Sequence, residues 1–124
     1  MEKNFSHLIG VKYEKLNCWE LCKEFYKTVF NTELKHYYDS IPEGRNEIKA
    51  LISTHEKDFQ KVRSPKFGDL LTIKMHGVES HIAVFVGNGM FLHTTKGTGS
   101  VIDRIAKWNR MIVGYYSLNK DAND

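Results

Sequence analysis

The sequence predicts an α+β fold, in which a helical half precedes an antiparallel sheet. Residues 18–30 place apolar side chains at helical spacing, whereas residues 70–118 contain short apolar runs separated by glycine-rich turns. Strands that follow helices, rather than alternating with them, favour an α+β arrangement over a parallel α/β sheet. The 124 residues are enough for one hydrophobic core, so we expect a single domain over residues 1–124.

Composition and charge narrow the class of protein. Hydrophobic residues make up 41% and charged residues 27% of the chain, as in ordinary globular proteins. We expect no membrane insertion, because no apolar run approaches the ~20 residues that span a bilayer. We also expect synthesis in the cytoplasm without a signal peptide, since the N-terminus has no long apolar stretch. The net charge of +3 is spread over scattered lysines and forms no basic run, so we expect no nucleic-acid partner.

The first predicted helix covers residues 18–30, "CWELCKEFYKTVF". Asn17 suits the N-cap position, because its side-chain oxygen can accept a hydrogen bond from an unpaired backbone N–H. Glu20 stands three residues later and completes a capping box. The pattern therefore makes Cys18 the first residue of this helix.

A second helical region is predicted after "DSIPEG". Asp39 or Ser40 can cap it, and Pro42 suits a first turn. Apolar positions keep a helical rhythm over residues 48–62, and Pro65 ends the helical half.

Five strands are then predicted from alternating or continuous apolar runs, with a strong turn signal in "GNG" between the second and the third. The five runs are "KFGDLLTIKM", "HIAVFVG", "MFLHTT", "GTGSVID" and "RMIVGYYSL".

Cys18 is the candidate nucleophile. A thiol reacts as its thiolate, and a helix N-terminus lowers a thiol pKa through its unpaired N–H groups and dipole. The alternative is a small buried hydrophobic residue. Cys22 lies four residues later, where a disulfide to Cys18 would distort the helix, so both are expected as thiols. This spacing is a weak zinc signal, because structural zinc needs four ligands, and we predict neither metal nor cofactor.

His81 and His93 bracket the predicted hairpin "HIAVFVGNGMFLH". We expect them at matching ends of adjacent antiparallel strands, where Cβ atoms of opposed residues are about 5 Å apart. One imidazole could then act as a base near neutral pH while the other fixes its orientation. The alternative is a pair of surface histidines. Surface positions are also expected for the other four histidines, which are His7, His36, His55 and His76.

Taken together, four segments resemble the NlpC-type family of papain-like cysteine peptidases. They are "NCWELC" for the cysteine-bearing helix start, "SPKFGDLLTIK" for the Pro-x-x-Gly-Asp strand entry, "HIAVFVGNGMFLH" for the histidine block and "WNRMIVGYYSL" for the closing strand. The likeness spans about residues 11–118. It implies a papain-like fold, with N-terminal helices packed on a five- to six-stranded antiparallel sheet and the catalytic cysteine at a helix N-terminus.

The resemblance also implies an activity. The family hydrolyses peptide bonds in bacterial peptidoglycan stem peptides, usually between D-γ-glutamate and a diamino acid. Mapped onto this sequence, Cys18 would be the nucleophile, His81 the base and His93 the residue that orients it. The backbone N–H of Cys18 would bind the oxyanion. Tyr13 matches an upstream family tyrosine near the oxyanion, or is a packing tyrosine.

Two positions depart from the commoner family pattern. Many members have Asp and Ser beside the cysteine, where they recognise a free amine on the stem peptide, but this chain has Asn17 and Trp19. The Cys-Trp-x-Leu form resembles members associated with bacteriophage tails, which implies other tail proteins as partners and action at a host cell wall from the virion. Two other functions stay open: a thiol hydrolase or acyltransferase on another amide or a lipid ester, and a catalytically silent tail protein.

Overall fold

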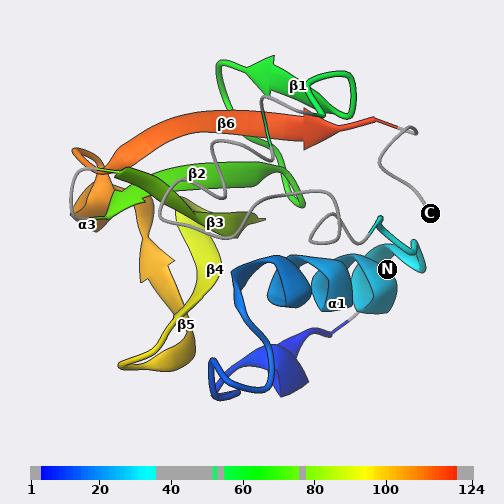
Figure 1. Ribbon diagram of the computed structural model, residues 1–124, viewed down its shortest axis with the longest axis vertical. Helices are drawn as coiled ribbons and strands as arrows, with labels where there is room; N and C mark the ends of the chain where they lie inside the picture. The colour runs from blue at the N-terminus through cyan, green and yellow to red at the C-terminus, as the bar shows by residue number, and fades with distance from the viewer. Residues whose placement is uncertain (1–3, 36–51, 53–54, 76–77, 120–124) are drawn as a thin grey trace.

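The computed structural model describes residues 4–35, 52, 55–75 and 78–119. Within these residues, six strands form one sheet in the order β1-β6-β2-β3-β4-β5, and every neighbouring pair is antiparallel (Figure 1). The strands are β1 (Phe59–Val62), β2 (Leu70–Met75), β3 (Val78–Gly87), β4 (Met90–Thr95), β5 (Gly99–Arg104) and β6 (Ile112–Leu118), and the helices are η1 (Ser6–Leu8), α1 (Cys18–Phe30) and α3 (Ile105–Trp108).

The five strands predicted from the sequence correspond to β2 through β6. Strands β2 to β5 form a meander of neighbours, and β6 returns to pair with β2. The short helix α3, which connects β5 to β6, was not predicted. It has only four residues, fewer than a periodic pattern needs to become visible.

Helix α1 begins at Cys18 because a capping box fixes its N-terminus, as the sequence predicted. The side chain of Asn17 accepts a hydrogen bond from the backbone N–H of Glu20 at 3.0 Å, and the Glu20 carboxylate accepts one from the Asn17 N–H at 3.1 Å. Such a cap stabilises a helix by about 1 kcal/mol. At the other end Asn31 adopts a left-handed conformation, with φ of 51°, and closes the last turn.

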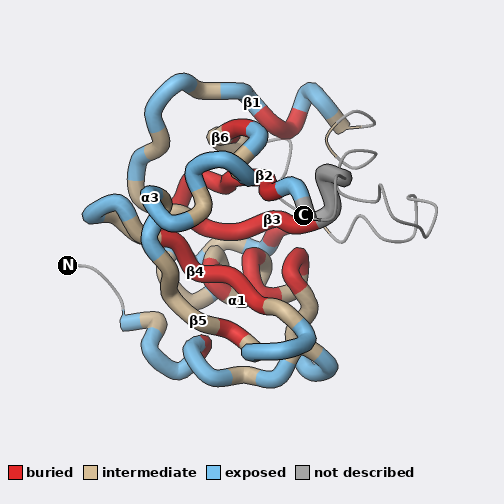
Figure 2. The backbone as a smooth tube through the Cα atoms, turned by 90° about the vertical axis from the view of Figure 1, so that its left-hand side faces the viewer, coloured by how far each residue is buried: buried red, intermediate tan, exposed pale blue. Residues whose placement is uncertain are grey.

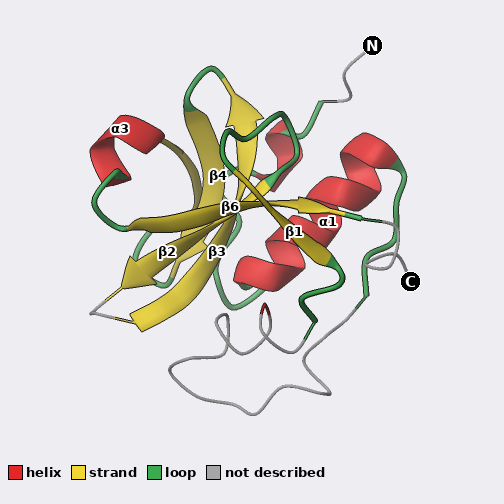
Figure 3. Ribbon diagram, turned by 90° about the horizontal axis from the view of Figure 1, so that it is seen from above, coloured by secondary structure: helices red, strands yellow, loops and turns green. Residues whose placement is uncertain are grey.

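The sheet carries apolar side chains on both faces. One face packs against α1, whose Trp19 and Phe25 are completely buried. The opposite face carries a smaller cluster around Ile73 and Phe91, against which Trp108 of α3 packs. Figure 3 shows α1 and α3 on opposite sides of the sheet, and Figure 2 shows buried residues concentrated in β2, β3, β4 and α1. The core therefore holds the N-terminal end of α1 in a fixed position against the central strands.

The predicted helical rhythm over residues 48–62 was wrong at its C-terminal end. Phe59 and Val62 belong to β1, where they pair with Leu118 and Tyr115 of β6. Apolar residues three apart fit a helical turn, but pairing with β6 gives this segment a ladder partner that a local pattern cannot reveal. The proposed start of that helix, between residues 39 and 51, lies outside the described residues.

Among the described helices, none has the length and apolar character required to cross a membrane.

Candidate active site

The thiol of Cys18 lies at the N-terminal end of α1. The residue is only 2% exposed, and Asn17 and Glu20 on either side of it form the capping box. The first N–H groups of a helix have no partner within the helix and carry partial positive charge, which favours an anion at this end. Helix α1 packs against β3 and β4, the two strands that contain His81 and His93. The fold thus brings the cysteine-bearing helix onto the histidine-bearing hairpin.

His81 and His93 are joined by a hydrogen bond. Nε2 of His81 lies 3.0 Å from Nδ1 of His93, and the two residues are 6% and 1% exposed. They are not directly opposed, because Val84 pairs with Leu92 and the same register, extended by one residue, sets His93 opposite Ala83. The expectation of matching strand ends was therefore wrong by two residues. The rings still meet because aromatic side chains reach a diagonal neighbour on the same face of the sheet.

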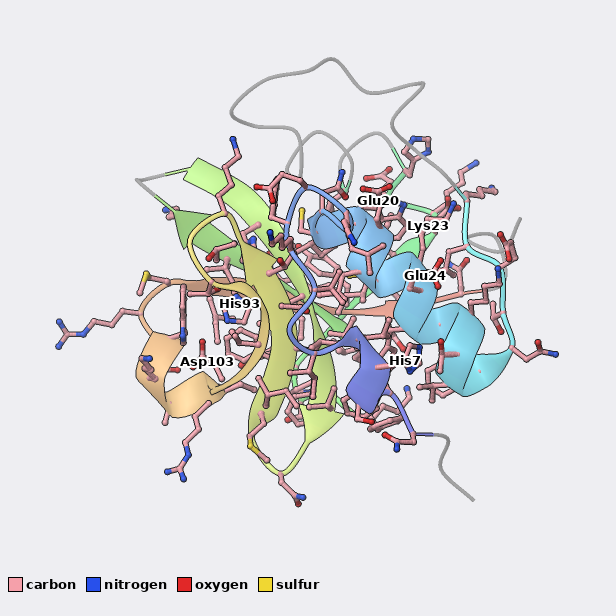
Figure 4. All side chains as sticks on the ribbon, turned by 90° about the horizontal axis from the view of Figure 1, so that it is seen from below. His7, Glu20, Lys23, Glu24, His93 and Asp103 are labelled. Carbon is pink, nitrogen blue, oxygen red and sulfur yellow. The ribbon has the colours of Figure 1, made fainter. Side chains whose placement is uncertain are left out.

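Asp103 extends the pair to a chain of three groups, and sequence reasoning missed it. Its Oδ2 lies 2.8 Å from Nε2 of His93, and its Oδ1 lies 3.6 Å from Nζ of Lys107. In the β4–β5 ladder His93 pairs with Val101, so Asp103 is the next residue on the same face. Figure 4 shows Asp103 beside His93. The sequence does show an acidic residue on the strand after His93. Whether that residue lies on the same face as His93 and beside it depends on the β4–β5 register, which the sequence does not reveal.

Aromatic side chains enclose the His93 ring. The centroid of Phe91 lies 4.8 Å from that of His93, and the centroid of Trp108 lies 5.0 Å away with the rings nearly perpendicular. These contacts leave the edges of the imidazole for His81 and Asp103. The ring is therefore held by packing on its sides and by hydrogen bonds at both nitrogens.

Burial keeps both histidines neutral near pH 7. Burial, together with a smaller contribution from the neighbouring His93, lowers the pKa of His81 to about 3. Burial also lowers the pKa of His93, although the hydrogen bond and the charge of Asp103 act in the opposite direction. Burial raises the Asp103 pKa, but the hydrogen bond and electrostatic interaction with His93, together with the positive charge of Lys107, outweigh it and lower the pKa overall. At neutral pH the hydrogen-bonded set of His81, His93 and Asp103 therefore contains two neutral imidazoles and one carboxylate.

The other three site residues predicted from the sequence lie around α1. Asn17 uses its side chain to cap the helix. Trp19 is fully buried, and its indole N–H donates to the carbonyl of Lys35, so the structure gives it a packing role. Tyr13 is half-buried, with Nζ of Lys96 5.9 Å from the centre of its ring.

A groove runs between the loop before α1 and the β4–β5 turn. Its volume is about 370 Å³, and Tyr13 and Lys96 stand on its two walls. Because Tyr13 precedes Cys18 by five residues and Lys96 follows His93 by three, this groove joins the segments that carry the candidate site. A larger hollow of about 790 Å³ lies at the β3–β4 turn, at the opposite end of β3 from His81.

The other histidines that the structure describes lie outside the hydrogen-bonded set of His81, His93 and Asp103. His7 is exposed and lies 3.4 Å from the Thr28 hydroxyl, and His55 is half-buried. His36 and His76 are outside the described residues. Across the described part of the chain, no three His, Cys, Asp or Glu side chains are grouped so that they could hold a metal ion. Neither cysteine is part of a disulfide.

We expect Cys22→Ser to leave the reactivity of the Cys18 thiol nearly unchanged. Cys22 is 1% exposed one turn deeper in α1, and burial raises its pKa well above the usual range, with the Cys18 charge adding to the rise. A buried, protonated thiol is a poor nucleophile. The variant should keep the rate at which iodoacetamide alkylates the protein within about threefold of the wild-type value. A loss above 100-fold, with an unchanged circular dichroism spectrum, would mean that Cys22 is the reactive thiol.

Comparison with protein families finds a match between residues 5–116 and the NlpC/P60 family. The matched region includes α1, the histidine hairpin, Asp103 and most of β6. A search of curated proteins finds no match.

Proposed function

Because the chain belongs to the NlpC/P60 family of cell-wall peptidases and amidases, we propose that it is a cysteine peptidase that hydrolyses peptidoglycan stem peptides. The proposed nucleophile is Cys18, the base is His81 and the orienting residue is His93. The observation that carries the proposal is the hydrogen bond between the two buried histidines, on strands that pack against the helix beginning at Cys18.

The burial of both histidines supports a catalytic rather than a surface role. Surface histidines are hydrated and titrate near their ordinary pKa, whereas His81 is 6% exposed and stays neutral. A neutral imidazole is the form that can accept a proton from a thiol. Buried groups with shifted pKa values and a specific polar partner are typical of functional sites.

The proposed reaction proceeds in two steps. His81 takes the proton from the Cys18 thiol, and the sulfur attacks the carbonyl carbon of the scissile amide. The oxyanion is stabilised by the Cys18 backbone N–H at the positive end of α1. His81 then gives its proton to the leaving amine, which departs and leaves a thioester on Cys18. In the second step His81 takes a proton from water, the hydroxide releases the carboxylic acid, and the thiol is regenerated.

We place the cleaved bond between D-γ-glutamate and the diamino acid, on the resemblance to the family. This chain has Asn17 where many members carry an aspartate, and the Asn17 side chain caps α1. A neutral amide cannot offer an ion pair to a free amine, so we expect little preference for a stem peptide with a free N-terminus.

Digestion of purified peptidoglycan, followed by mass spectrometry of the released fragments, tests the proposal. We expect fragments that begin with a diamino acid carrying a new free amine. Protein alkylated with iodoacetamide serves as the control and should release none. Absence of fragments together with rapid alkylation of Cys18 would support Cys18 as the nucleophile and indicate that the substrate is another amide or a lipid ester. Absence of fragments together with an unreactive Cys18 would favour a catalytically silent structural protein.

A role in a bacteriophage tail is a separate proposal. It is supported by the likeness of the Cys-Trp-x-Leu form of residues 18–21 to tail-associated members, and it would bring the peptidase to the host wall within the virion.

A further inference from the structure

We propose that Asp103 is a positioning residue whose carboxylate, acting through His93, keeps a proton on Nε2 of His81 and leaves Nδ1 of His81 as the base. The proposal rests on the function proposed above for His81, and it adds a fourth residue to the three inferred from the sequence. Asp103 does not need to touch the substrate for this role.

The first step concerns the Asp103–His93 bond. A carboxylate can only accept hydrogen bonds, so the 2.8 Å contact requires a hydrogen on Nε2 of His93. Because His93 is neutral, its other nitrogen, Nδ1, has no hydrogen and acts as an acceptor.

The second step carries this choice to His81. Nδ1 of His93 accepts across 3.0 Å, so Nε2 of His81 must be the donor. Since His81 is also neutral, its hydrogen is on Nε2 and its Nδ1 has a lone pair. One carboxylate on β5 thereby determines which nitrogen of a histidine on β3 can act as the base.

The residues around His93 and Asp103 fix which nitrogen of each ring carries the hydrogen. Phe91 and Trp108 pack against the His93 ring, so the ring cannot turn over without displacing them. Asp103 is 21% exposed, and its hydrogen bond with His93 is the largest of the interactions that lower its pKa and keep it ionised. The same carboxylate therefore acts as an acceptor across the neutral range.

Asp103→Asn tests the proposal, because the amide has nearly the same shape but can also donate. An amide N–H directed at Nε2 of His93 would move the hydrogens of both rings to Nδ1, and His81 would then lack a base. For a soluble stem tripeptide, we expect kcat to fall about 100-fold and KM to change by less than about threefold. Asp103→Glu restores a carboxylate and should recover at least about a tenth of the wild-type kcat.

Lys107→Gln is the matched control. The Lys107 side chain is 71% exposed and is the charged group near the other oxygen of Asp103. Its replacement leaves the hydrogen bond between Asp103 and His93 in place. We expect its kcat to stay within about twofold of the wild-type value.

Nitrogen-15 NMR of the imidazole rings gives a readout that does not depend on substrate. In the wild-type protein at pH 7, both His81 and His93 should carry their hydrogen on Nε2, and Asp103→Asn should lose this pattern. If the wild-type spectrum puts the hydrogen of His93 on Nδ1, the proposal is overturned, whether or not the variants fold. If Asp103→Asn keeps both the pattern and the kcat, Asp103 has no positioning role, while the peptidase function stands. If the pattern behaves as expected but the wild-type protein cleaves no peptidoglycan, the proposed function fails instead.

Discussion

Replacing Cys18 with alanine should abolish hydrolysis while leaving the fold nearly as stable as before. Removing the nucleophile of a covalent mechanism lowers the rate by about 10⁴-fold or more, because the remaining groups can only polarise the substrate. The capping box that starts α1 uses Asn17 and Glu20, which are unchanged, so the helix should begin at the same residue. The loss of one buried sulfur atom should cost about 1 kcal/mol of unfolding free energy. Release of stem-peptide fragments and urea denaturation measure the two quantities.

Cys22→Ser is the control for this experiment, because it removes the other buried thiol of α1. Fragments released by Cys18→Ala at more than about 1% of the wild-type rate would contradict the covalent mechanism. A similar loss in both variants would point to damage to α1 rather than to chemistry.

The start of α1 could be predicted from the sequence because its causes are local. Asn17 and Glu20 are three residues apart and contact the same turn, so the capping box is visible in four letters of sequence. The strands β2 to β6 were also accessible, since alternation of apolar residues and a Gly-Asn-Gly turn act within a few residues. The position of the candidate nucleophile at a helix N-terminus followed from these local signals.

The connections between strands could not be predicted in the same way. The contact of Asp103 with His93 depends on the β4–β5 register, and the pairing of β1 with β6 joins segments more than fifty residues apart. The two histidines meet diagonally rather than directly, because the register of the hairpin differs from a symmetrical reading of its turn. The two histidines could be picked out from their positions around the turn, but the hydrogen bonds that join them to each other and to Asp103 could be identified only from the tertiary structure.

Replacing His81 with glutamine should lower kcat about 10³-fold, the second largest effect that we expect. The amide can still donate to Nδ1 of His93, so the hydrogen bond that now spans 3.0 Å can persist. It cannot accept the thiol proton or return it to the leaving amine, and loss of a general base costs about 10²- to 10⁴-fold. His7→Gln is the matched control, because His7 is an exposed histidine on η1. Both variants can be assayed on the same soluble stem peptide.

The same variant should also change how stability depends on pH. The folded-state pKa of His81 is about 3, well below the ordinary value of 6.5, so below pH 6.5 the unfolded chain binds a proton that the folded protein does not. The free energy of unfolding therefore falls as the pH falls from about 6.5 towards 3, by up to about 1.4 kcal/mol per pH unit for this one group. His81→Gln removes that contribution, so between pH 7 and 4.5 it should lose about 2–3 kcal/mol less than the wild-type protein, as measured by urea denaturation at each pH.

His7→Gln is the control for the removal of a histidine as such, because His7 is exposed on η1, outside the hydrogen-bonded set of His81, His93 and Asp103. If His81→Gln loses stability towards acid as steeply as the wild-type protein, His81 must protonate in the folded state near its ordinary pKa. A preformed ion pair between Cys18 and His81 would instead raise the His81 pKa above 6.5, and its contribution to stability would be lost as the pH rises through that pKa. The stability curve therefore decides whether the resting site contains a neutral base or a preformed thiolate–imidazolium pair.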